Sequence, residues 1–233
     1  MKKAFCLVLC VLLLVCTSGC NKAKGPYTIL PMEQVRGKVD TEMIDRFLTD
    51  NDDYDFYGEL KSNYPAILSE LVNVTPKALK DKCSIYRFLY GKGGGLTGEA
   101  FLVYDGAVYP LGTGLGGWGV TEFAYINQDG QDKLYFIYSW GSGMHHSHIG
   151  LFDFSTKQLM DTGSLFDTFG QGDIAFCLSD DQQTLGICEA EIYWSDWGAE
   201  YLLEVDIDKG EYAYDISAFE FTIIDPDKSN WHP

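Results

Sequence analysis

From residue 84 onward, the sequence alternates short runs of aromatic and β-branched residues with clusters of glycine, aspartate and asparagine. Runs with a period of two are typical of β-strands, and the intervening residues are those that favour turns. The run Leu134–Trp140 is apolar at every second position and also carries Tyr135 and Ile137, which predicts a strand buried on both faces. The pattern therefore predicts a mainly β fold, an antiparallel strand meander.

Three segments of this region can be laid over one another at a spacing of about 50 residues. Each segment contains a strand, a glycine-rich connection and a second strand that ends at an aspartate, and these aspartates are Asp105, Asp153 and Asp206. The segment Leu178–Leu185 resembles the hairpin of β-propeller blades, in which a Ser-Asp turn separates two inner strands. The resemblance implies about three blade-like repeats in a propeller-like arrangement, and a β-sandwich is the alternative.

Residues 38–83 have a helical pattern. A helix is expected from Asp40, where an aspartate and a threonine provide a cap and the next apolar residues fall on one face. A second helix is expected over Tyr57–Leu71, and a short third one begins at Thr75, which is followed by a proline. The predicted organisation is a short N-terminal helical part packed with the β-meander, residues 84–233, as one domain.

The first twenty residues form a separate unit. Two lysines precede an apolar stretch over Ala4–Val15, which is too short to span a bilayer. The segment Thr17–Cys20 places small residues at a cleavage point and resembles the lipobox of bacterial lipoproteins, with threonine where that family usually has leucine. The resemblance implies that residues 1–19 are a lipoprotein signal peptide and that Cys20 is lipidated.

Such processing leaves a strongly acidic chain. Loss of residues 1–19 removes two of the 17 basic residues, so 15 basic residues face 34 acidic ones and the formal charge is −19. Nucleic acid is therefore not an expected partner, because its binding requires cationic side chains. The charge also disfavours contact with anionic lipid, so the acyl chains on Cys20 are expected to hold the protein at the membrane through a tether, residues 20–37. The predicted location is the bacterial cell membrane, facing outward.

Three cysteines remain after this processing, namely Cys83, Cys177 and Cys188. An odd number allows at most one internal bridge. Cys177 and Cys188 flank a predicted hairpin turn, Ser179–Gln183. A disulfide between these two cysteines and a pair of buried free thiols are both open from the sequence.

The densest group of polar side chains follows Trp140, where His145, His146 and His148 are close in sequence. In an extended strand, His146 and His148 point to one face and His145 to the other. Two histidines on one face could supply two of the ligands of a zinc site, which also requires a third protein ligand. The alternative is a polar loop entering a strand, with imidazoles hydrogen-bonded to the backbone or at the rim of a cleft.

Two further segments contain the residue types of known sites. Asn127–Asp132 resembles calcium loops of FG-GAP-type repeats, but tyrosine and lysine stand where that motif has acids, so a turn at Asp129 and Gly130 is the favoured interpretation. Asp161–Ser164 matches the tetrapeptide of aspartic proteases, whose chemistry requires a second copy, and a turn is predicted here too. The sequence contains no nucleophile elbow, Walker loop or dinucleotide fingerprint.

These observations predict a non-enzymatic binding or scaffold lipoprotein with an unknown protein or small-molecule partner. Its binding surface is expected on the loops Gly114–Gly119 and Trp140–His148, because tryptophans beside glycines form platforms for sugar rings or peptides. No cofactor is predicted, apart from the zinc and calcium alternatives. The second functional hypothesis is a metal-assisted hydrolase that uses His146 and His148. The candidate ligand-binding residues are Trp118, Trp140, His145, His146 and His148.

Overall fold

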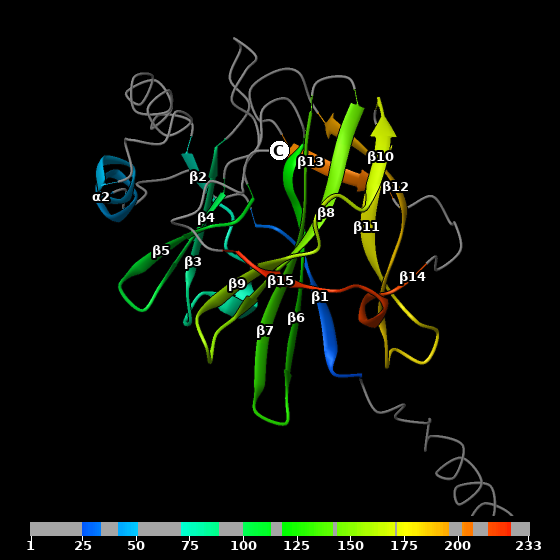
Figure 1. The fold of residues 1–233 in the computed structure, drawn as a ribbon, viewed down its shortest axis with the longest axis horizontal. Coiled ribbons are helices and arrows are strands. Elements are labelled where there is room, and N and C mark those ends of the chain that lie inside the picture. The colour runs from blue at the N-terminus through cyan, green and yellow to red at the C-terminus, as the bar shows by residue number, and fades with distance from the viewer. Residues whose placement is uncertain are drawn as a thin grey trace, which may run out of the picture.

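The computed structural model of the 233-residue chain describes residues 25–33, 42–50, 71–88, 100–112, 118–141, 144–170, 172–195, 202–206 and 214–224. Most of these residues form antiparallel strands in three sheets (Figure 1), which confirms the predicted mainly β class. Within these ranges, no helix has both the length and the apolar character needed to cross a membrane.

The largest sheet has seven strands. Its pairing order is β1 (Tyr27–Leu30), β6 (Gly119–Gln128), β7 (Gln131–Trp140), β8 (Met144–Asp153), β9 (Gln158–Asp161) and β15 (Thr222–Ile223), while β10 (Phe166–Phe169) pairs with β8. Between β6 and β7, Asp129 and Gly130 have φ angles of 54° and 78°, the left-handed values of a two-residue hairpin turn. The turn predicted within Asn127–Asp132 is thus confirmed.

The other two sheets have four strands each. One contains β2 (Leu71–Asn73), β3 (Ser84–Phe88), β4 (Ala100–Tyr104) and β5 (Ala107–Pro110); the other contains β11 (Gly172–Leu178), β12 (Leu185–Ser195) and β13 (Leu202–Asp206), with β14 (Tyr214–Asp215) paired to β12. β11 and β12 form the predicted hairpin. Each predicted repeat lies in a different sheet, but the second shares its sheet with β1, β10 and β15, and a propeller-like arrangement is not confirmed.

The N-terminal part differs from the prediction in two places. The helix α2 (Glu42–Asp50) lies where the first helix is expected, whereas residues 51–70 are outside the described residues. At the third expected helix, only a 3-10 turn forms, over Lys77–Leu79. Thr75 does not cap this turn, because its Oγ1 accepts a hydrogen bond from the backbone N–H of Ile85. Leu71 begins a strand because β2 pairs with β3.

Part of the predicted tether range forms a strand in the structure. Residues Tyr27–Leu30, which fall within the tether range 20–37, form the edge strand β1 and pair with β6. Leu30 is buried in the core beneath that strand. Cys20 lies outside the described residues.

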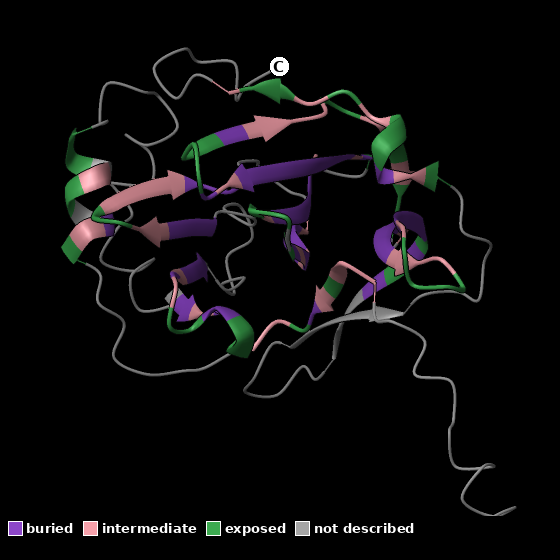
Figure 2. Cartoon of the chain, turned by 90° about the horizontal axis from the view of Figure 1, so that it is seen from below, coloured by how far each residue is buried: buried purple, intermediate pink, exposed green. Residues whose placement is uncertain are grey.

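The central strand β7 is buried on both faces, as predicted. Leu134, Phe136 and Tyr138 belong to a core shared with side chains of β3 and β4. Tyr135 and Ile137 belong to a second core, shared with side chains of β11 and β12. Buried residues are concentrated along the inner strands, and exposed residues lie at the outer turns and edges (Figure 2). The seven-stranded sheet therefore packs against other strands on each side.

Candidate ligand-binding site

Alternation along β8 divides the predicted histidines between its two faces. The rings of His146 and His148 lie 4.4 and 6.4 Å from the Trp140 ring, measured between centroids. The His145 ring lies 5.6 Å from the Trp118 ring and points the other way. The prediction that His146 and His148 share one face is confirmed, and the five candidate residues lie at the same end of β6, β7 and β8.

His148 takes part in a chain of hydrogen bonds. The indole Nε1 of Trp140 lies 3.0 Å from Nε2 of His148, and Nδ1 of His148 lies 3.1 Å from Oδ1 of Asp161. The Tyr138 hydroxyl donates to the second carboxylate oxygen of Asp161 over 2.7 Å. An indole N–H only donates, so Nε2 of His148 accepts and the ring proton is on Nδ1. In this arrangement, neither ring nitrogen offers a free lone pair to a metal ion.

His146 is bonded to a carboxylate of the adjacent strand. Its Nδ1 lies 2.7 Å from Oδ1 of Asp167, its cross-strand partner on β10. Among the residues that the structure describes, no group of three or more His, Cys, Asp or Glu side chains is arranged to hold a metal ion. The zinc alternative at His146 and His148 therefore has no third ligand in the described part of the chain, and it stays a prediction.

On the opposite face of β8, the buried carboxylate of Asp173 is hydrogen-bonded to polar side chains of neighbouring strands. Asp173 is 2% exposed and accepts hydrogen bonds from the hydroxyls of Ser139 and Ser147, over 2.7 and 2.6 Å. Burial raises the pKa of Asp173, and these hydrogen bonds act in the opposite direction. Both serine hydroxyls donate to this carboxylate, so within the described ranges they are not paired with a histidine base.

Two buried polar atoms beside this group have no hydrogen-bond partner among the described residues, namely Nδ1 of His145 and Oγ1 of Thr168. These two residues are cross-strand partners on β8 and β10. Burial lowers the pKa of His145, and the nearby Asp173 carboxylate opposes this shift. Since buried polar atoms are rarely unsatisfied, a water molecule or a ligand is expected to complete the bonding of these two atoms.

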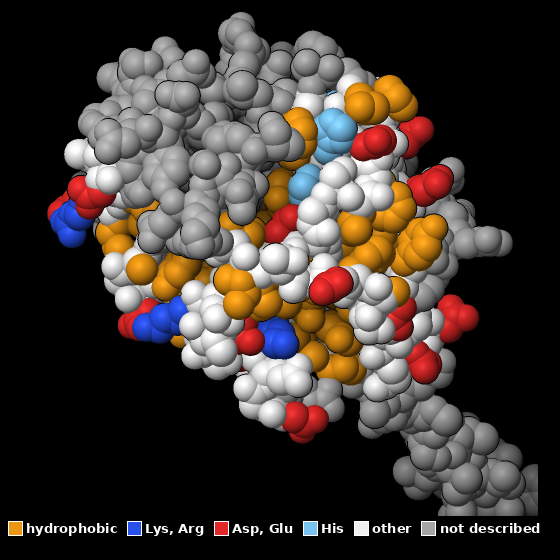
Figure 3. Space-filling view, viewed as in Figure 1, with side chains coloured by type: hydrophobic (Ala, Val, Ile, Leu, Met, Phe, Trp, Pro, Cys, Tyr) orange, Lys and Arg blue, Asp and Glu red, His pale blue; other side chains and the backbone are white. Residues whose placement is uncertain are grey.

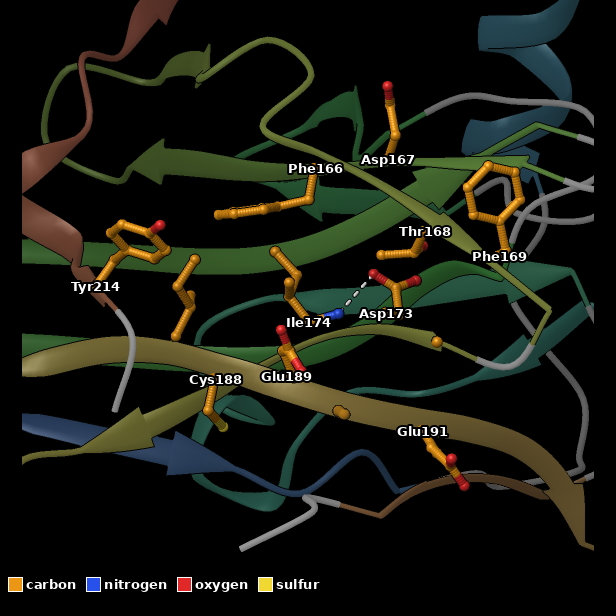
Figure 4. A pocket seen from close by; sticks show the side chains of 13 residues that line it. Phe166, Asp167, Thr168, Phe169, Asp173, Ile174, Cys188, Glu189, Glu191 and Tyr214 are labelled. Carbon is orange, nitrogen blue, oxygen red and sulfur yellow. Dashed lines mark hydrogen bonds between the residues drawn. The ribbon is translucent and has the colours of Figure 1, made fainter. Parts of the chain in front are cut away.

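A hollow of about 550 Å³ lies between β10 and the sheet of β11, β12 and β14 (Figure 4). It forms because β10 and β11, although consecutive in the chain, pair with different strands, β8 and β12. Phe166 and Thr168 line it from β10, and Ile174 and Glu189 line it from the β11–β12 hairpin. Tyr214 of β14 lies at one end, with its ring 5.7 Å from that of Phe166. We call this space the β10 hollow.

The other side of β10 continues the face of β8 that carries His146 and His148, which we call the histidine surface. Asp167 and Phe169 point away from Asp173 and Glu189 (Figure 4). Phe169 is 69% exposed, and its cross-strand partner Met144 is 37% exposed. Histidine side chains reach the surface here beside hydrophobic and acidic groups (Figure 3). Strand β10 thus separates the histidine surface from the β10 hollow.

Sequence patterns predict the histidine surface but not the β10 hollow. The walls of the hollow come from β10, β11, β12 and β14, which no local pattern brings together. Residues 113–117, most of the other predicted loop, lie outside the described residues. Comparison of the chain with models of known protein families, with curated proteins and with solved structures finds no match.

Proposed function

We propose that this protein is a lipid-anchored binding module of the bacterial cell envelope, and that it binds a small molecule or a short segment of a partner in the β10 hollow. The hollow itself carries the proposal, because it is concave and combines aromatic and aliphatic side chains with several acidic groups. Ligand sites on proteins are usually concave and combine apolar walls with polar groups that fix the orientation of the ligand. Of the predicted histidines, His146 and His148 lie on the opposite side of β10, whereas His145 lies on the same side as Thr168 and Asp173.

The polar groups around the hollow support binding rather than catalysis. The Ser–His pair that activates a serine nucleophile in many hydrolases is not formed by the described residues. Ser139 and Ser147 both donate to the buried Asp173, and on the other face of β8 both nitrogens of His148 are engaged by Trp140 and Asp161. These contacts support a non-enzymatic role.

The membrane anchor is proposed from the lipobox-like segment that ends at Cys20. Since β1 begins at Tyr27, six residues separate Cys20 from the first strand. Six fully extended residues reach at most about 20 Å. The proposed lipid would therefore hold the domain close to the membrane surface.

Labelling with radioactive palmitate tests the anchor. We expect the full-length protein to incorporate label in a bacterial host and the Cys20→Ser variant to lose it. Cys16→Ser, which removes another cysteine of the same N-terminal segment, should label normally. Undiminished labelling of Cys20→Ser would contradict the anchor.

Saturation-transfer NMR on residues 21–233 with a set of neutral, cationic and anionic aromatic fragments tests the binding site. We expect some fragments to bind, and we expect Glu189→Trp, which fills the β10 hollow, to abolish their signals. Glu42→Trp places the same side chain on α2, away from the hollow, and should leave the signals intact. Absence of binding, or equal binding to Glu189→Trp, would overturn the proposal.

A further inference from the structure

We infer that the β10 hollow takes an organic cation, a ligand with a primary ammonium group at one end and an apolar body about the size of an aromatic ring. This inference rests on the proposed function and narrows it to one ligand class. It is carried by the charge of the lining, by its hydrogen-bonding groups and by its aromatic wall.

The ionisable side chains that line the β10 hollow are all acidic among the described residues. Asp173, Glu189 and Glu191 line the β10 hollow, and no lysine, arginine or histidine does so among the described residues. Asp167 also belongs to the lining, but its carboxylate points away and is bonded to His146. A concave site with carboxylates of one sign attracts cations and disfavours anions.

The hydrogen-bonding groups on the inner side of β10 can accept hydrogen bonds from a ligand that carries donors. Thr168 lies beside Asp173 (Figure 4), and its buried Oγ1 has no partner within the described ranges. A carboxylate has about four acceptor positions, and Asp173 uses three of them for Ser139, Ser147 and the backbone N–H of Ile174. An ammonium group has three donors and no acceptor, so it matches this end of the hollow better than a hydroxyl or a carboxylate does.

The opposite end of the hollow is apolar. The rings of Phe166 and Tyr214 are tilted by 42° to one another, with their centroids 5.7 Å apart. Ile174 and Ile187 belong to the core beneath them and also line the hollow. Aromatic faces bind apolar ligand bodies and also attract cations, so both parts of the proposed ligand find complementary walls.

Titration calorimetry at fixed ionic strength with three probes of one skeleton tests the ligand class. The probes are 4-phenylbutylamine, 4-phenylbutan-1-ol and 4-phenylbutyrate, which differ in the charge of one end. We expect the amine to bind about tenfold more tightly than the alcohol, since hydrogen bonds to charged groups are the stronger ones. The carboxylate should not bind measurably.

Two charge-matched variants locate the effect. Glu189→Gln should weaken amine binding about fivefold and leave alcohol binding unchanged, because it removes one charge from the lining and little volume. Glu42→Gln removes the same charge from α2 and should change neither. If Glu42→Gln weakens amine binding as much as Glu189→Gln does, the amine is attracted by the overall negative charge of the protein, and the proposed site is wrong.

The failures of the two proposals are distinguishable. Equal binding of amine and alcohol, both lost in Glu189→Trp, overturns the cation inference and leaves the binding function standing. If fragments bind in the β10 hollow but the amine does not, the cation inference is likewise overturned and the binding function stands. If neither the fragments nor the three probes bind, both proposals are wrong.

Discussion

The indole Nε1 of Trp140 donates a hydrogen bond to Nε2 of His148 over 3.0 Å, and this bond determines which ring nitrogen of His148 carries the proton. The Nδ1 proton is then directed to Asp161, which also accepts from Tyr138. These hydrogen bonds join β7, β8 and β9 on the face of the sheet opposite Asp173. They give the histidine a structural role that its position in the sequence does not reveal.

Replacing Trp140 with phenylalanine tests this role. The change keeps an aromatic ring against His146 and removes the indole donor, so Nε2 of the largely buried His148 loses its partner. We expect the free energy of unfolding to fall by about 1–2 kcal/mol, measured by urea denaturation. In a His148→Phe background, the same change should cost clearly less. An equal cost in both backgrounds would show that the bond contributes nothing.

Glu122 should make stability depend on pH. Burial raises its pKa to about 8, although the backbone N–H of Phe176, which donates to its carboxyl group, opposes the shift. Its ordinary value is 4.5, so the unfolded chain releases this proton at a lower pH than the folded chain does. Stability from this group is therefore fully present below about pH 4.5 and is lost as pH rises toward 8.

Glu122→Gln isolates this contribution because glutamine keeps an oxygen acceptor and does not ionise. We expect the variant to gain stability over the parent protein as pH rises from 5 to 8, by up to about 1.4 kcal/mol per pH unit. Denaturant titrations across this range measure the difference. Glu220→Gln, on the exposed surface, is the control and should follow the parent. A constant difference between Glu122→Gln and the parent would contradict the raised pKa.

Gly150 should not tolerate a side chain. A Cβ atom at this position in β8 would lie 2.0–2.6 Å from ring atoms of Phe136, which is fully buried on the paired strand β7. Gly150→Ala is expected to lower the free energy of unfolding by about 1–3 kcal/mol through overpacking, measured by thermal or urea denaturation. Adding Phe136→Leu should recover part of the loss. If alanine alone is neutral, the strands are not packed at this distance.

The three cysteines beyond Cys20 should be free. Cys83, Cys177 and Cys188 are thiols in the structure, and burial raises the pKa of Cys83 to about 12. A hydrogen bond from Cys177 lowers the pKa of Cys188 and raises that of Cys177 itself. We expect residues 21–233 to take up three iodoacetamide groups in denaturant, with or without prior reduction, as measured by intact mass.

A matched variant identifies the thiols that react. Cys83→Ala should lower the count from three to two under both conditions. Uptake of a single group before reduction and three after it would instead show a Cys177–Cys188 disulfide.

Several elements follow from local sequence alone. Asp129 and Gly130 predict the β6–β7 turn because an Asp-Gly pair tolerates left-handed φ angles. Alternation along β8 predicts that His146 and His148 share a face. Local sequence was misleading at Thr75, whose side chain bonds to Ile85 of β3 rather than to a helix end. Where a side chain could form several local hydrogen bonds, the neighbouring strand thus determines which one forms.

The sequence by itself determined the mainly β class, the Asp129-Gly130 turn and the shared face of His146 and His148, because alternation and turn preferences act over a few neighbouring residues. Only the tertiary structure decided what those side chains do. The partner of His148 is Asp161, on another strand, and the β10 hollow joins Phe166 to Tyr214, which is 48 positions later in the chain. Such contacts depend on which strands pair, and pairing depends on the packing of the whole core.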